Sequence, residues 1–196
     1  MEEVKVKSRF RVKVIPFGRM SGSVVVPLRL TKTSEVAEMV SDAAGVVAAI
    51  RGFSKPFRIF LDKTVLTLSP DTLHKLLDTF HDAMFPCLLY YDGSVDVSQF
   101  DFDWVAVIPE NDREIVQTSA DEVIIRWRTR TGDMERFDKL YKYKNKVIVL
   151  DSAGDFDLCQ DASDFVSRNP DWVLSFSSEK ELIIYFGEGI FDGQSS

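Results

Sequence analysis

The chain has 196 residues and a net charge of −7, and 45% of its residues are hydrophobic, including 15 Phe. This composition excludes an intrinsically disordered chain, and the length fits one domain or two small ones. Two cysteines are too few for a disulfide framework, and no stretch approaches the ~20 apolar residues that cross a bilayer. We therefore expect a soluble cytoplasmic protein with no membrane partner.

The charge is distributed unevenly along the chain. Residues 1–59 and 122–146 carry net charges of +6 and +4, whereas residues 60–121 and 147–196 carry −9 and −8. A uniform polyanion mimic, or a protein that is basic overall, would not show this alternation.

The first predicted element is a strand at 4–15, in which apolar and cationic residues alternate. Because successive side chains of a strand point to opposite faces, one face is expected to be apolar and the other cationic. The cationic row is a solvated surface or a binding surface for an acidic partner. Its members are Lys5, Lys7, Arg9, Arg11 and Lys13.

The rest of the first half alternates between strand and helix patterns. A helix at 70–84 is the best marked, because Ser69 can cap it, Pro70 suits its first position and Pro86 follows it. The other expected elements are a returning strand at 23–30, a helix at 33–45, strands at 57–61 and 65–68, and a strand at 87–91.

This order resembles ubiquitin-like β-grasp domains. The local matches are the helix SEVAEMVSDAAGV, the segment RIFLDKTVL with the Leu-rich LSPDTLHKLL, and the closing strand CLLYY. The resemblance implies an α+β fold with a β-grasp domain at 1–92. It also implies a domain that binds and is not conjugated, since no Gly-Gly follows the closing strand. Phe60 falls within the family's binding patch, and the basic row around it implies an acidic partner.

An acidic stretch at 93–103 is expected to link this domain to a second one at 104–196. The second domain is predicted to be a smaller, mostly-β α+β domain with long strands and one short helix. Its expected elements are strands at 104–108, 123–129 and 137–150, a helix at 162–169, and a hairpin of 172–176 with 182–186.

A second basic segment, 126–146, mixes cations with aromatic residues. Cations beside stacking surfaces suit single-stranded nucleic acid. A half-buried sheet with Trp127 and Tyr143 in the core is the other interpretation, and the acidic balance of the chain favours it. The cations singled out are Arg126, Arg128, Arg130, Lys142 and Lys144.

Motifs for catalysis, cofactors and metals are weak. The acidic run at 151–164 lacks the glycine and the third ligand of an EF-hand loop. His74 and His81 lie two helical turns apart, too far to share a metal easily. There is no phosphate-binding loop, dinucleotide fingerprint or nucleophile elbow. A dyad of Cys87 with a histidine stays open, although CLLYY predicts a core position. We expect no catalytic residue, cofactor or metal.

The resulting hypothesis is a non-catalytic adaptor or scaffold that binds an acidic partner or self-associates through its basic and acidic surfaces. The alternatives are a single-stranded nucleic-acid or phosphate binder acting through 126–146, a small acidic inhibitor or immunity-type protein, and an enzyme of unrecognised type. The predicted partner-binding residues are Lys5, Lys7, Arg9, Arg11, Lys13, Phe60, Arg126, Arg128, Arg130, Lys142 and Lys144.

Overall fold

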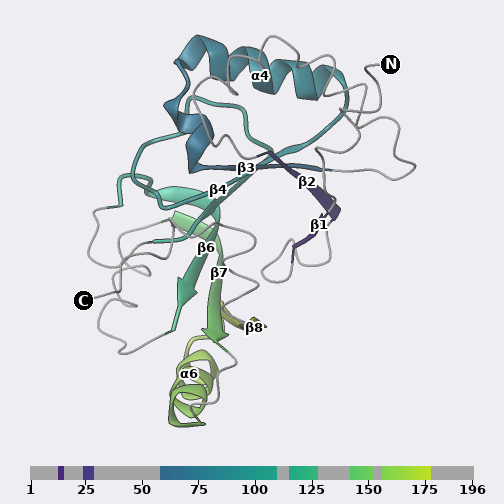
Figure 1. Cartoon of the computed structure of the whole chain (residues 1–196). Coiled ribbons are helices and arrows are strands. Elements are labelled where there is room, and N and C mark those ends of the chain that lie inside the picture. Colours follow the sequence, from purple (N-terminus) through teal and green to yellow (C-terminus); the bar gives the residue numbers. More distant parts are fainter. Residues whose placement is uncertain are drawn as a thin grey trace, which may run out of the picture. The chain divides into compact units, whose positions relative to one another are not determined.

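The computed structural model describes residues 13–15, 24–28, 58–109, 115–127, 142–151 and 156–177. Figure 1 shows the helices and strands coloured along the sequence. The chain divides into two compact units. The first consists of Met1–Val14, Ser23–Tyr90 and Ser98–Trp104, and the second of Ile15–Gly22, Tyr91–Val97 and Val105–Ser196. Among the described residues no helix is long and apolar enough to span a membrane.

The first unit is built on strands that neighbour one another in chain order. They are β1 (Lys13–Val14), β2 (Val24–Leu28), β3 (Arg58–Asp62) and β4 (Cys87–Tyr91). β1 is antiparallel to β2, whereas β3 is parallel to both β2 and β4. A parallel neighbour requires a crossover connection. Between β3 and β4 the crossover consists of the 3-10 helix η1 (Lys63–Thr67) and the helix α4 (Pro70–Asp82) (Figure 1).

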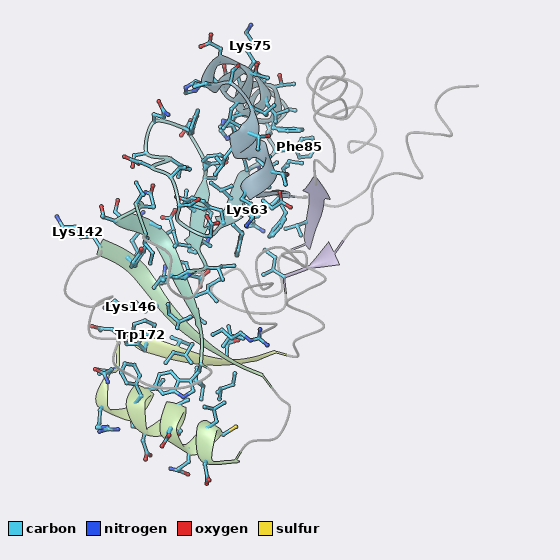
Figure 2. All side chains as sticks on the ribbon, turned by 60° about the vertical axis from the view of Figure 1, so that its left-hand side comes forward. Lys63, Lys75, Phe85, Lys142, Lys146 and Trp172 are labelled. Atoms are coloured by element: carbon cyan, nitrogen blue, oxygen red, sulfur yellow. The ribbon has the colours of Figure 1, made fainter. Side chains whose placement is uncertain are left out.

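Helix α4 forms where the sequence predicts it. The Ser69 hydroxyl accepts a hydrogen bond from Thr72 N at 3.3 Å, and Pro70 follows at the first helical position. One face of the helix is buried, and Lys75 on the other face points away from the ribbon (Figure 2). The buried face consists of Leu73, Leu76, Leu77 and Phe80.

The second unit repeats the parallel pattern. Its strands are β5 (Trp104–Val107), β6 (Ser119–Arg126), β7 (Lys142–Asp151) and β8 (Trp172–Ser177), parallel to one another and ordered as in the chain. Helix α6 (Phe156–Arg168) connects β7 to β8. Its Phe165 ring lies 5.3 Å from Trp127 and 5.9 Å from Trp172, so aromatic contacts hold α6 against the strands.

The predicted fold class, α+β with a β-grasp domain, is wrong, and so is the resemblance to ubiquitin-like proteins. Residues 65–68 do not form the expected strand, because they belong to η1 and the turn after it. Asp62 caps η1 by accepting from Thr64 N at 2.9 Å, so the chain leaves β3 through a helical turn. β4 then returns parallel to β3. The fold is therefore a parallel α/β arrangement.

Other predicted elements agree with the structure to different degrees. The predictions at 70–84, 87–91 and 104–108 are confirmed by α4, β4 and β5, within two residues at each end. Helix α6 begins six residues before the predicted 162. β8 pairs in parallel with β7. The helix at 33–45 and the hairpin strand at 182–186 lie outside the described residues, and the linker at 93–103 stays a prediction.

Replacing Leu76 with alanine tests the packing of α4. Leu76 is fully buried, so Leu76→Ala is expected to lower the free energy of unfolding by about 2–5 kcal/mol. Urea denaturation followed by circular dichroism measures the change. The exposed neighbour provides the control, since Lys75→Ala is expected to stay within about 0.5 kcal/mol of the parent. Equal effects of the two variants would contradict this packing.

Candidate metal site at the start of strand β4

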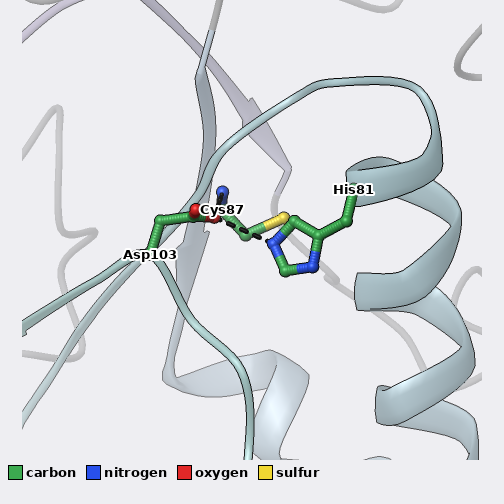
Figure 3. A group of neighbouring side chains, drawn as sticks. All are labelled: His81, Cys87 and Asp103. Atoms are coloured by element: carbon green, nitrogen blue, oxygen red, sulfur yellow. Dashed lines mark hydrogen bonds and ion pairs between the residues drawn. The ribbon is translucent and has the colours of Figure 1, made fainter.

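Three side chains of the first unit converge beside β4. The ligand atoms of His81, Cys87 and Asp103 all lie within 4.8 Å of one another (Figure 3). They offer an imidazole nitrogen, a thiol sulfur and a carboxylate oxygen. We call these three residues the ligand trio. Among the described residues, which include every histidine and cysteine of the chain, no other group of this kind occurs.

Each member of the ligand trio has a fixed position in the fold. His81 lies in the last turn of α4, and Cys87 is the first residue of β4, next to Ile59 of β3. Asp103 lies in the segment 98–104. Its N–H donates to Cys87 O at 3.0 Å, and its Oδ2 accepts from Cys87 N at 2.7 Å. This reciprocal pair of hydrogen bonds fixes the carboxylate at the beginning of the strand.

The segment 98–104 is also attached to α4 at two points. The His74 ring lies 5.0 Å from the Phe100 ring, and His81 Nε2 lies 2.9 Å from Asp103 Oδ2. The two histidines of α4 thus do not converge on one point. They contact the same segment two helical turns apart.

The imidazole of His81 lies between two carboxylates. Since a carboxylate only accepts hydrogen bonds, the 2.9 Å contact of Nε2 with Asp103 places a ring proton on Nε2. Nδ1 lies 3.9 Å from Asp101 Oδ2, which is too long for a hydrogen bond. His81 is therefore oriented mainly by Asp103.

Cys87 carries a neutral thiol in this environment. Its side chain is fully buried, and Sγ–H donates to Phe85 O at 3.7 Å. Burial, followed by the negative charges of Asp103 and Asp101, raises the pKa of the thiol far above its ordinary value. Because the thiolate is the nucleophilic form, the arrangement does not make Cys87 a nucleophile paired with His81.

A bound cation would reverse this preference, because a coordinating thiol loses its proton. The mixture of imidazole, thiol and carboxylate favours a transition-metal ion such as Zn²⁺ over Mg²⁺ or Ca²⁺, which prefer oxygen ligands. The His81 and Asp103 side chains are 26% and 43% exposed, so the trio borders solvent. Three protein ligands with solvent access leave a fourth tetrahedral position for water.

The distance between the imidazole nitrogen and the carboxylate oxygen defines one part of the change that metal binding requires. Tetrahedral zinc bonds to nitrogen and oxygen of about 2.0–2.2 Å place the two ligand atoms about 3.4 Å apart. His81 Nε2 and Asp103 Oδ2 are 2.9 Å apart, so they must separate by about 0.5 Å as the proton between them is replaced.

The residues predicted to bind a partner fall mostly elsewhere. Phe60 is only 1% exposed and stacks on Tyr90 with ring centroids 5.0 Å apart, so it belongs to the core. Arg126 is half-buried on β6. Lys13 lies on β1, although its side chain is not described. Outside the described residues lie Lys5, Lys7, Arg9, Arg11, Arg128 and Arg130.

Two predicted cations come together on one face of β7. Lys142 and Lys144 are both exposed, and Lys142 projects outward at the start of the strand (Figure 2). Lys144 Nζ forms an ion pair with Asp121 Oδ1, so its charge is partly balanced within the unit. Binding of an acidic partner, or self-association, through such cations stays a prediction.

The comparisons with known proteins concern the fold. No protein-family model matches the sequence, and no curated protein sequence matches it. The structure, a parallel α/β fold, is similar to solved structures. One is the crystal structure of QueE from Escherichia coli, with a TM-score of 0.61 and 13% sequence identity over 91% of this chain and 99% of that chain. At this identity the likeness concerns the fold alone.

This likeness corrects the functional hypothesis drawn from the sequence. QueE is a radical SAM 7-carboxy-7-deazaguanine synthase, and the likeness to it supports a parallel α/β fold in place of the β-grasp domain from which the hypothesis was drawn. The predictions of a non-catalytic adaptor or scaffold, and of a chain that is not an enzyme, are therefore wrong. They depended on a β-grasp domain that the chain does not form. The nucleic-acid and inhibitor alternatives competed with that hypothesis, and the comparison with QueE supports neither of them.

The cofactor of radical SAM enzymes does not fit this chain. Their radical chemistry uses an iron–sulfur cluster, and such clusters are held by sets of cysteine thiolates, with histidine replacing some in a minority of cases. The chain has two cysteines, Cys87 in the first unit and Cys159 on α6 in the second. The ligand trio contains one thiol. These residues do not form a cluster-binding set.

Reactivity toward iodoacetamide tests the state of the thiols. In the folded protein near neutral pH, Cys159 is expected to be alkylated much faster than Cys87, because Cys87 is buried and its raised pKa keeps it protonated. Peptide mass spectrometry measures both sites. In urea the two cysteines should react alike. Fast alkylation of Cys87 in the folded protein would contradict the neutral, buried thiol.

Reconstitution with iron and sulfide tests whether the two cysteines of the chain can bind an iron–sulfur cluster. After anaerobic incubation and desalting, we expect no iron–sulfur absorption in the visible spectrum, because the two thiols of the chain do not provide the ligands of a cluster. The double variant Cys87→Ser, Cys159→Ser is the matched control and should give the same spectrum. A chromophore that appears in the parent and disappears in this variant would show that the chain holds a cluster.

Proposed function

We propose that this chain is a metal-dependent enzyme of the parallel α/β class, in which His81, Cys87 and Asp103 bind a transition-metal ion such as Zn²⁺. The observation that carries the proposal is the convergence of three different donor atoms within 4.8 Å. The likeness of the fold to that of QueE supports the enzymatic part of the proposal. The sequence lacks a set of cysteines that could bind an iron–sulfur cluster, so the chemistry that we propose differs from radical SAM chemistry.

The reaction class that this donor set favours is metal-assisted hydrolysis. A zinc ion held by these three residues would supply an activated water molecule and a Lewis acid for a substrate carbonyl or phosphoryl group. The residues of the chain would hold and orient the ion. Asp103 is held by Cys87 N–H, and His81 is held by the end of α4. Cys87 contributes the buried ligand, and the exposed sides of His81 and Asp103 leave access for substrate.

The position of the ligand trio distinguishes it from the usual site of parallel α/β folds. Such folds generally bind ligands at the carboxyl ends of their strands. Cys87 is the first residue of β4 and lies at the amino end. The proposed metal site is thus inferred from its own three residues and not from the usual position of sites in this fold. Metal binding therefore has to be measured first, and enzymatic turnover second.

A reduced thiol is a condition for this function. Zinc coordination requires Cys87 as thiolate, and no disulfide joins the two cysteines, which are both free. A reducing compartment meets this condition, so a cytoplasmic location is part of the proposal.

Cobalt binding tests the proposal. The full chain, treated with chelator and kept reduced, is titrated with Co²⁺. We expect visible bands of tetrahedral cobalt with a near-ultraviolet thiolate-to-cobalt band, and Zn²⁺ should displace both. His81→Ala and Cys87→Ser each remove a ligand of the metal. We therefore expect each to weaken cobalt binding by more than about 100-fold, which is the upper limit for substitutions of residues that only contact a ligand.

The chain provides matched controls for this experiment. It has one further histidine and one further cysteine, so His74→Ala and Cys159→Ser remove the same groups outside the ligand trio and should bind as the parent does. Turnover is then tested with p-nitrophenyl acetate as a general hydrolytic probe, comparing the zinc-loaded parent with His81→Ala. A parent that binds no cobalt, or binding that persists in both ligand variants, would refute the proposal.

A further inference from the structure

Asp101 lies on the edge of the His81 ring that faces away from the other ligands. Its Oδ2 is 3.9 Å from His81 Nδ1, whereas Nε2 on the opposite edge is 2.9 Å from Asp103. The Asp101 side chain is 94% exposed. A side chain this exposed can rotate toward Nδ1 without displacing packed neighbours.

A neutral ring with its N–H on Nε2 accounts for the present distance to Nδ1. A neutral imidazole has one N–H, and the contact with Asp103 places it on Nε2. Nδ1 then presents a lone pair to the Asp101 carboxylate, which also only accepts hydrogen bonds. Two acceptors do not bond, so a gap of 3.9 Å between them is expected.

A metal ion at Nε2 changes this relation. The ion takes the lone pair of Nε2, so the ring proton of the neutral imidazole moves to Nδ1. Nδ1–H can then donate to Asp101 Oδ2 after the two atoms approach by about 1 Å, to an ordinary hydrogen-bond distance. Metal-binding histidines usually donate their second N–H to a carboxylate or carbonyl, which fixes the ring and increases its basicity.

We propose that Asp101 is a positioning residue of the metal site, which accepts a hydrogen bond from His81 Nδ1 when the ion is bound at Nε2. The inference rests on the proposed function, because it assumes that the ligand trio binds metal. Asp101 is not a ligand of the same ion. A metal bound in the ring plane at Nε2 lies on the other side of the imidazole.

The test is the affinity of the full chain for Zn²⁺, measured by competition with a chromophoric chelator, together with its cobalt spectrum. Asp101→Ala is expected to weaken zinc binding by about 10- to 100-fold, the range typical for outer-shell partners of metal-bound histidine. The cobalt spectrum should keep its tetrahedral bands and its thiolate band, since all three ligands remain. The thermal midpoint of the metal-free chain should not change.

Two further variants distinguish the positioning role from a general effect of negative charge. Asp101→Glu restores a carboxylate within reach and should recover most of the affinity. Asp82→Ala removes another exposed carboxylate, on the residue after His81, and should bind zinc as the parent does. Equal affinities of Asp101→Ala and Asp82→Ala would overturn the inference, because only overall charge would then matter.

The remaining outcomes are also decisive. Loss of the tetrahedral cobalt bands in Asp101→Ala, as expected for His81→Ala, would make Asp101 a ligand and overturn the positioning role. A parent chain that binds neither ion would refute the proposed function and this inference together. A parent that binds zinc tightly with no effect of Asp101→Ala would refute the inference alone.

Discussion

The reciprocal hydrogen bonds between Cys87 and Asp103 are the constraint on which the candidate site depends. Cys87 N–H donates to the Asp103 carboxylate, and Asp103 N–H donates to Cys87 O. If the carboxylate moved away, it would leave the Cys87 N–H at the strand start without its partner, which costs about 1–3 kcal/mol for a buried group. The same oxygen contacts His81, so this one exchange connects the end of α4, the start of β4 and the segment 98–104.

The fold and the reactive groups of this chain provide different kinds of information. The overall path is similar to that of QueE at 13% identity, which shows that a parallel α/β arrangement tolerates almost complete replacement of side chains. A cluster, in contrast, depends on a few thiolates at fixed positions, and two cysteines in separate units do not provide them. A shared fold therefore does not imply a shared reaction, and function has to be argued from the residues of the site.

Local structure is predictable where local interactions determine it. The cap at Ser69, the proline after it and the apolar stripe of α4 are all encoded within fifteen residues, and the helix forms as expected. The direction of β4 relative to β3 is not predictable in this way. It depends on whether the residues after Asp62 turn back or continue into a helical crossover, and the apolar residues of 65–68 favour the wrong choice. Strand pairing is decided by partners distant in sequence, so the β-grasp interpretation follows from one misread turn.

The sequence does not reveal the site for a related reason. Sequence proximity groups His81 with His74 on the same helix, although its spatial neighbours are Cys87, beyond the turn at Met84, and Asp103, sixteen residues after Cys87. A dyad of Cys87 with a histidine is compatible with the sequence, but no local pattern indicates that Asp103 joins it. Only the hydrogen bonds of the β4 backbone bring that carboxylate to the histidine.

If the ligand trio binds an ion as proposed, the environment of Cys87 also determines which ions it selects. Burial and two nearby carboxylates keep the thiol protonated, so an ion must displace a tightly held proton before it binds. Hard ions such as Mg²⁺ gain little from sulfur and cannot compensate for that step, whereas zinc and cobalt form strong bonds to thiolate. The burial that makes the metal-free thiol unreactive would thus also disfavour hard ions such as Mg²⁺. Selectivity would arise from the proton that the ion replaces, and the oxygen of Asp103 alone would not provide it.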